Sequence, residues 1–194
     1  MKMRAIVLFL AAFAAMAPGV AAAQTELSPQ PTGDWTHTPT GTVFPVTMGD
    51  FDRMPVKVFE NREMWSLAYS NVKDDLVLTV NFYVYPSRGG SCADETVKVG
   101  NQTQMVDGSA LVSKGRAASP AGRTANAASY WRHTLPEGTI PGMGELISDS
   151  YLFCSPDGKW FVAYRATWEG KGGEDPHDSV TTLLGMIRWP ANLQ

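Results

Sequence analysis

One stretch, residues 76–85 (LVLTVNFYVY), constrains the fold more than any other part of the chain. Its residues alternate between two faces, as the side chains of a β-strand do. One face is uninterrupted and apolar, and consists of Leu76, Leu78, Val80, Phe82 and Val84. The other face mixes polar and aromatic residues, and consists of Val77, Thr79, Asn81, Tyr83 and Tyr85. This pattern predicts a central strand of an antiparallel sheet, with one face on the core and the other partly solvated.

Five other segments have shorter alternating or β-branched patterns. They are predicted to be strands and cover residues 53–60, 64–71, 129–135, 145–154 and 159–168. The last two flank the sequence SPDG (155–158), which is typical of a hairpin turn because proline and glycine suit turn positions. The chain therefore contains enough strands for one antiparallel sheet of about six strands.

A first helix is predicted over residues 93–112. Asp94 and Glu95 fall in its first turn, where a carboxylate interacts favourably with the helix dipole. Gly100 and Gly108 weaken this helix by about 1 kcal/mol each relative to alanine.

A second helix is predicted to follow Asp175 and Pro176, a capping residue and a proline at the first helical position. Its apolar stripe has the spacing i, i+3, i+4 and i+7, and consists of Val180, Leu183, Leu184 and Ile187. The predicted order of elements is βββαβββα. This order predicts a single α+β domain over residues 44–194, an antiparallel sheet of about six strands with both helices packed on one face.

The order of elements, with VFPVTMGDFDR (43–53) leading into the first strand, resembles the exported PsbP-like and DcrB-like domains of bacteria and plastids. The resemblance extends over roughly residues 43–190 and concerns the order and size of the elements. It implies a single α+β domain that acts as a non-catalytic envelope or assembly factor. It carries no catalytic motif, and no functional residue is transferred from it.

Residues 1–23 have the features of a secretory signal peptide. Lys2 and Arg4 precede an apolar stretch over residues 5–16, and small residues at 21–23 suit a signal peptidase. The apolar stretch is shorter than the ~20 residues that span a bilayer. We expect cleavage before Gln24, a periplasmic or secreted protein without a membrane span, and a flexible segment at residues 24–43, which are rich in proline, threonine and glycine.

The chain has two cysteines, Cys92 and Cys154. An even number of cysteines in an exported domain predicts a disulfide bond, which would close a loop of about 60 residues. A thioredoxin-like redox site needs the spacing Cys-X-X-Cys, and a structural zinc site needs four ligands; neither pattern is present. Two free structural thiols and a reactive cysteine are the alternatives.

Three other segments contain residue types that are common in catalytic or metal sites. Ser91 lies in GGSCA (89–93), which lacks the final glycine of a nucleophile elbow and favours a helix-capping serine. The acidic segment 169–178 lacks the ligand spacing of a calcium loop and favours a solvated helix start. His133 falls in a predicted strand, and no partner that would make it a general base is evident. The sequence therefore predicts no metal, no cofactor and no catalytic residue.

The aromatic residues of the predicted strands suggest a ligand platform instead. The candidate residues are Tyr83, Tyr85, Trp160, Tyr164 and Trp168, and the alternative is ordinary packing within a covered core. The formal net charge of −3 argues against a nucleic-acid partner. We expect a non-catalytic monomer that binds an envelope protein or a small ligand. An assembly factor and an exported hydrolase using His133 or the acidic segment are the alternatives.

Overall fold

The fold is described from a computed structural model, which describes residues 24–59, 64–73, 76–170 and 175–194. The predicted signal peptide lies outside these residues. Twelve strands are assigned: β1 (Gln24–Glu26), β2 (Trp35–His37), β3 (Thr42–Phe44), β4 (Thr47–Met48), β5 (Phe51–Arg53), β6 (Lys57–Phe59), β7 (Trp65–Lys73), β8 (Leu76–Pro86), β9 (Ala110–Ala117), β10 (Ala128–Leu135), β11 (Leu146–Cys154) and β12 (Trp160–Glu169). The helices are α1 (Cys92–Gln102) and α2 (His177–Met186), with short 3₁₀ turns at Thr103–Met105 and Ala191–Leu193.

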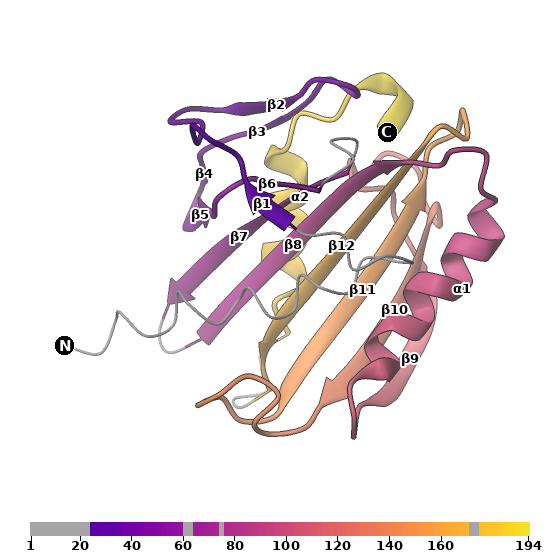
Figure 1. Ribbon diagram of the computed structural model, residues 1–194. Coiled ribbons are helices and arrows are strands. Elements are labelled where there is room, and N and C mark those ends of the chain that lie inside the picture. The colour runs from indigo at the N-terminus through magenta and orange to yellow at the C-terminus, as the bar shows by residue number, and fades with distance from the viewer. Residues whose placement is uncertain (1–23, 60–63, 74–75, 171–174) are drawn as a thin grey trace.

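One antiparallel sheet of ten strands forms the body of the protein. Its main path runs β1-β6-β7-β8-β12-β11-β10-β9, and β4 and β5 join it at β7. Strands β2 and β3 form a separate two-stranded sheet. The five long strands β7, β8, β12, β11 and β10 were all predicted, and β8 is central, as its pattern indicates (Figure 1).

The two helices cover opposite faces of this sheet (Figure 1). On one side, the α2 face, Val180 and Leu183 of α2 pack in one cluster with Val80 and Phe82 of β8. On the other side, the α1 face, Val99 of α1 packs with residues that alternate with these along the strands, Tyr85 among them. The hairpin β2–β3 adds a further cover to the α2 face, since Phe44 and Trp35 belong to the same cluster as α2.

The predicted α+β fold with six strands and two helices on one face is wrong in three respects. The helices lie one on each face. The second face of β8 carries the aromatic side chains of Tyr83 and Tyr85, and helix α1 shields them from water. The first helix ends at Gln102, and residues 110–117 form the edge strand β9. Residues 24–59, of which 24–43 were expected to be flexible, contribute six short strands. The protein is mostly β.

The helix α1 approaches the sheet closely at Gly100, and Gly100→Ala is expected to lower the free energy of unfolding by about 1–2 kcal/mol. A Cβ atom at this position would lie 2.8 Å from Trp131 Nε1 and 2.9 Å from Trp131 Cε2. The Trp131 ring is buried beneath the helix, so the backbone has to move. This cost exceeds the ~1 kcal/mol that alanine gains over glycine in helix propensity. Urea denaturation measures the change.

The second helical glycine provides a matched control. A Cβ atom on Gly185 in α2 would have no atom within 4 Å. Gly185→Ala is therefore expected to raise the free energy of unfolding by about 1 kcal/mol through helix propensity alone. If both substitutions stabilise the protein, the close approach of α1 to Trp131 is contradicted.

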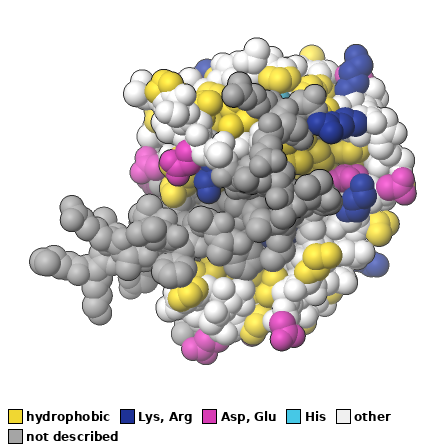
Figure 2. Space-filling view, in the orientation of Figure 1, with side chains coloured by type: hydrophobic (Ala, Val, Ile, Leu, Met, Phe, Trp, Pro, Cys, Tyr) yellow, Lys and Arg dark blue, Asp and Glu magenta, His cyan; other side chains and the backbone are white. Residues whose placement is uncertain are grey.

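Neither helix in the described part of the chain is long and apolar enough to cross a membrane. Acidic and basic side chains are interspersed on the side of the molecule seen in Figure 2. This distribution differs from the concentrated basic surface that is typical of nucleic-acid binding.

Candidate functional site

A cleft with a volume of about 650 Å³ opens between the α2 face of the sheet and helix α2. Three groups of residues line it. They are the segment 116–122 after strand β9, the sheet residues Tyr130, Arg132, Tyr151 and Tyr164, and the residues Asp175, His177, Thr181, Leu184 and Gly185 in and before α2. The volume lies within the range of pockets that hold small organic ligands.

Three tyrosines form the floor of the cleft. The antiparallel register places Tyr130 opposite Tyr151 and Tyr151 opposite Tyr164, so their side chains stand in one row across three strands. The rings of Tyr151 and Tyr164 are stacked, with centroids 4.5 Å apart and planes 9° apart. The rings of Tyr130 and Tyr151 have centroids 5.1 Å apart. Cross-strand packing of this kind holds the floor rigid.

An ion-pair network lies next to the tyrosine row. Arg132 donates through Nε and Nη2 to the two carboxylate oxygens of buried Asp149, both at 2.8 Å. Its Nη1 donates to Asp175 Oδ2, also at 2.8 Å, and its guanidinium carbon lies 5.4 Å from the ring centroid of Trp168. The hydrogen bond from Arg132 lowers the pKa of Asp175. The hydrogen bonds that Arg132 donates to Asp149 raise the pKa of Arg132, so its guanidinium stays charged at neutral pH.

The tyrosine hydroxyls differ in their partners. Tyr130 and Tyr151 donate to Asp149, at 3.3 Å and 3.4 Å. Tyr164 is 3% exposed, and its hydroxyl has no hydrogen-bond partner in the described part of the chain. Burial raises the pKa of Tyr151 and of Tyr164 well above the ordinary value, so both hydroxyls keep their protons at neutral pH.

The residues of the predicted ligand platform are divided between the two faces of the sheet. Tyr164 lines the cleft, and Trp168 is buried beside it, under Arg132. Trp160 also belongs to the α2 face, where its ring meets that of His37 edge-on. Tyr83 and Tyr85 pack on the α1 face, and Tyr85 donates to Glu95 of α1 at 2.7 Å. These five residues therefore do not form one surface.

Sequence reasoning missed Tyr130, Arg132 and Tyr151, which also line the cleft, and Asp149, the buried partner of Arg132. One signal was available for Tyr151. The hairpin turn at 155–158 pairs Cys154 with Phe161, and counting back along the two strands from that pair puts Tyr151 opposite Tyr164. The pairing of β10 with β11 crosses a longer connection, residues 136–145, from which no such count is possible.

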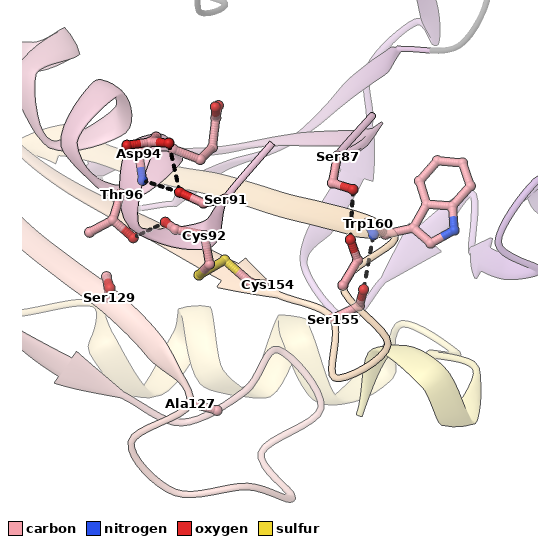
Figure 3. The surroundings of a disulfide bond; sticks show 12 residues. Ser87, Ser91, Cys92, Asp94, Thr96, Ala127, Ser129, Cys154, Ser155 and Trp160 are labelled. Carbon is pink, nitrogen blue, oxygen red and sulfur yellow. Dashed lines mark hydrogen bonds between the residues drawn. A yellow bond between two sulfur atoms is a disulfide. The ribbon is translucent and has the colours of Figure 1, made fainter. Parts of the chain in front are cut away.

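The disulfide bond between Cys92 and Cys154 is present, as predicted. It joins the first residue of α1 to the last residue of β11, with Cα atoms 6.0 Å apart (Figure 3). Ser91 caps α1, because its hydroxyl accepts a hydrogen bond from the backbone N–H of Asp94 at 3.0 Å. The disulfide bond therefore anchors the start of α1 to the sheet, away from the cleft, and the cap satisfies a backbone N–H at the helix start.

The remaining candidates for chemistry are not gathered into a site. His133 is fully buried on the α1 face, and neither ring nitrogen has a hydrogen-bond partner among the described residues. In the acidic segment, Glu169 accepts a hydrogen bond from the backbone N–H of Gly144, and Asp175 pairs with Arg132. Residues 171–174 of that segment lie outside the described residues. Within the described ranges, no group of three or more side chains is placed to hold a metal ion.

Comparisons with protein-family models, with curated proteins and with solved structures find no match. The resemblance to PsbP-like and DcrB-like domains therefore stays an expectation. The cleft above the three tyrosines is the feature of this fold that best suits a function.

Proposed function

We propose that the protein is an exported, non-catalytic domain that binds a small ligand in the cleft between the sheet and helix α2. The cleft itself is the observation that carries this proposal. It combines a volume of about 650 Å³ with a rigid aromatic floor and a few polar groups, which is the usual composition of a ligand pocket. Its floor is built from paired strands, so the pocket exists before a ligand enters.

The state of the polar groups supports binding over catalysis. The carboxylate of Asp149 accepts hydrogen bonds from Arg132, Tyr130 and Tyr151, which leaves it little capacity to take a proton from a substrate. A raised pKa keeps Tyr164 protonated, so it is a poor base. Groups with these properties orient a ligand and do not activate a nucleophile.

Export is supported by two features. Residues 1–23 have the composition of a signal peptide, and the disulfide bond suits an oxidising compartment such as the periplasm. We propose cleavage before Gln24 and a monomeric mature protein.

Filling the cleft tests the proposal. Gly185 lines the cleft and has open space beside it, so Gly185→Trp would place an indole ring there. We expect this variant to bind the fluorescent probe N-phenyl-1-naphthylamine at least tenfold more weakly than the unsubstituted protein. The matched control is Thr182→Trp, which adds the same ring at an exposed position of α2 that does not line the cleft. It should bind the probe normally.

Equal binding by Gly185→Trp and Thr182→Trp would place the probe elsewhere and contradict the proposal. Near-ultraviolet circular dichroism checks that both variants are folded. Failure of the unsubstituted protein to bind the probe would also count against a preformed pocket.

A second candidate function, assembly into an envelope complex, is favoured by strand β9. This strand ends the sheet on its main path, and its side chains are exposed over most of its length. Leu111 and Val112 are among them, although apolar side chains usually pack away from water. Subunits that co-purify with the exported protein would favour this function over ligand binding.

A further inference from the structure

We infer that the cleft selects an uncharged ligand with an apolar body and one hydroxyl or carbonyl group, which bonds to the hydroxyl of Tyr164. This inference rests on the proposed function and adds the chemical class of the ligand. Three observations carry it: the apolar walls, the compensated charges, and the single polar group on the floor that lacks a partner.

The walls of the cleft are mostly apolar. Segment 116–122 contributes Ala117, Ala118, Pro120 and Ala121, and helix α2 contributes Leu184 from the opposite side. The three tyrosine rings form the floor between them. A ligand that fills this space exchanges water for apolar contacts, at roughly 25 cal/mol per Å² of apolar surface buried.

The charged groups at the cleft are already paired. Arg132 carries one positive charge and bonds to two carboxylates, Asp149 and Asp175, so the network has a net charge of about −1. Among the described residues, an anionic ligand would meet this negative charge without a free cation as partner. A cationic ligand would gain little, because Asp175 is 48% exposed and is already bonded to Arg132.

The charge of Arg116 is directed away from the cleft, although this residue belongs to the lining segment. Its Nη1 donates to Ser129 Oγ at 2.9 Å, and its other donors bond to the carbonyl oxygens of Asn126 and Ala127. Ser129 pairs with Leu152 on the α1 face of the sheet, the face opposite to the cleft. Arg116 therefore does not supply a cation for an anionic ligand.

The hydroxyl of Tyr164 is the polar group that the fold leaves without a partner. This hydroxyl is not among the fully buried polar atoms that lack a partner, so it opens to the cleft, where a ligand atom can take the place of water. Tyr164 stands between the stacked ring of Tyr151 and the ring of Phe82, so it is held in place. One ligand atom that can donate or accept a hydrogen bond is sufficient to meet it.

Two fluorescent probes that differ by one charged group test the preference for an uncharged ligand. N-phenyl-1-naphthylamine is neutral, and 8-anilinonaphthalene-1-sulfonate is the same skeleton with a sulfonate. Binding is measured at pH 8, where imidazole side chains are neutral. We expect the sulfonate to bind at least tenfold more weakly than the neutral probe, because its charge would be desolvated without a partner.

The two proposals fail in different ways in this experiment. If the sulfonate binds as tightly as the neutral probe, and Gly185→Trp weakens both, the cleft binds ligands but the preference for uncharged ones is overturned. If neither probe binds the folded protein, the proposed function falls with the inference.

The role of Tyr164 is tested by displacing N-phenyl-1-naphthylamine with 2-naphthol and with naphthalene. We expect 2-naphthol to bind about two- to tenfold more tightly than naphthalene, the ratio that one net hydrogen bond gives. Tyr164→Phe should remove this difference and leave the melting temperature unchanged or higher, since the lost hydroxyl has no partner. Tyr85→Phe, on the opposite face of the sheet, is the control: it should lower stability through the lost bond to Glu95 and keep the preference for 2-naphthol. A preference for 2-naphthol that survives Tyr164→Phe would overturn the role of this hydroxyl.

Discussion

Replacing Cys92 and Cys154 together with alanine is expected to lower the free energy of unfolding by about 4 kcal/mol. The disulfide bond joins residues separated by 62 positions, and a cross-link of this span removes much of the conformational entropy of the unfolded chain. The double substitution avoids a free thiol, so the measured change reports the cross-link alone. Urea denaturation of the exported protein and of the double variant measures the difference.

The folded structure should survive this change, because other contacts hold α1 on the sheet. Val99 packs into the cluster on the α1 face, Tyr85 donates to Glu95, and Ser91 still caps the helix. The unsubstituted protein treated with a reductant should match the double variant. A difference below about 1 kcal/mol would contradict the entropic role of the bridge, and loss of the native near-ultraviolet spectrum would show that the bridge is needed to form the folded state.

The long strands and helix α2 could be predicted from the sequence because each buries at least one apolar side along several residues. In β8, Val80, Phe82 and Val84 alternate with polar residues because their side chains are buried on the α2 face. In α2, the buried residues Val180, Leu183 and Leu184 form the apolar stripe that faces the sheet. A periodic pattern appears wherever one side of an element is buried along several residues, and there the sequence is informative.

The edge strand β9 and the short N-terminal strands could not be predicted for the opposite reason. Nearly every side chain of β9 is exposed, so no alternation marks it, and its pairing with β10 supplies its backbone hydrogen bonds. Strands β1 to β6 have two or three residues each, which is too short for a period to appear. The apolar stripe of a helix shows that the helix packs against the sheet. It does not show which face of the sheet the helix covers, because that depends on how the connecting segments run.

The candidate site was only partly predictable, because it consists of side chains from neighbouring strands that are far apart in the sequence. Tyr164 was recognised as an aromatic residue on a strand, but its neighbour Tyr151 became relevant only through the register of β11 with β12. The bidentate pairing of Arg132 with Asp149 likewise depends on the register of β10 with β11. A single sequence gives residue types and periods, whereas a cleft of this kind depends on which strands lie side by side.

His37 provides the second large effect, a loss of stability in mild acid. Its side chain is fully buried among the rings of Trp35, Trp65 and Trp160, at centroid distances of 5.6–6.4 Å. Nδ1 lies 2.7 Å from Thr40 Oγ1, and Nε2 has no partner in the described part of the chain. Removal from water disfavours the charged imidazolium and lowers the pKa of His37 from 6.5 to about 4.

The free energy of unfolding is therefore expected to fall as the pH is lowered from about 6.5 to about 4. In this range the unfolded chain binds a proton at His37 and the folded protein does not, so acid favours unfolding. Above pH 6.5 the neutral His37 makes its full contribution to the free energy of unfolding, and below pH 4 this contribution is lost completely. The difference between a pKa of 6.5 in the unfolded chain and about 4 in the folded protein corresponds to a change of about 3 kcal/mol in the free energy of unfolding. Urea denaturation at closely spaced pH values measures the slope.

The substitution His37→Phe isolates this contribution, because phenylalanine fits an aromatic pocket and does not titrate. Thr40 keeps a partner in this variant, since its hydroxyl lies 2.9 Å from Thr42 Oγ1. The variant should lose most of the pH dependence between 6.5 and 4. His133 is also buried and also has a pKa lowered by burial, so His133→Phe should remove a separate share of the slope. A wild-type slope retained in His37→Phe would show that His37 takes up its proton without unfolding the protein. The aromatic pocket around it would then have to open to water in the folded state.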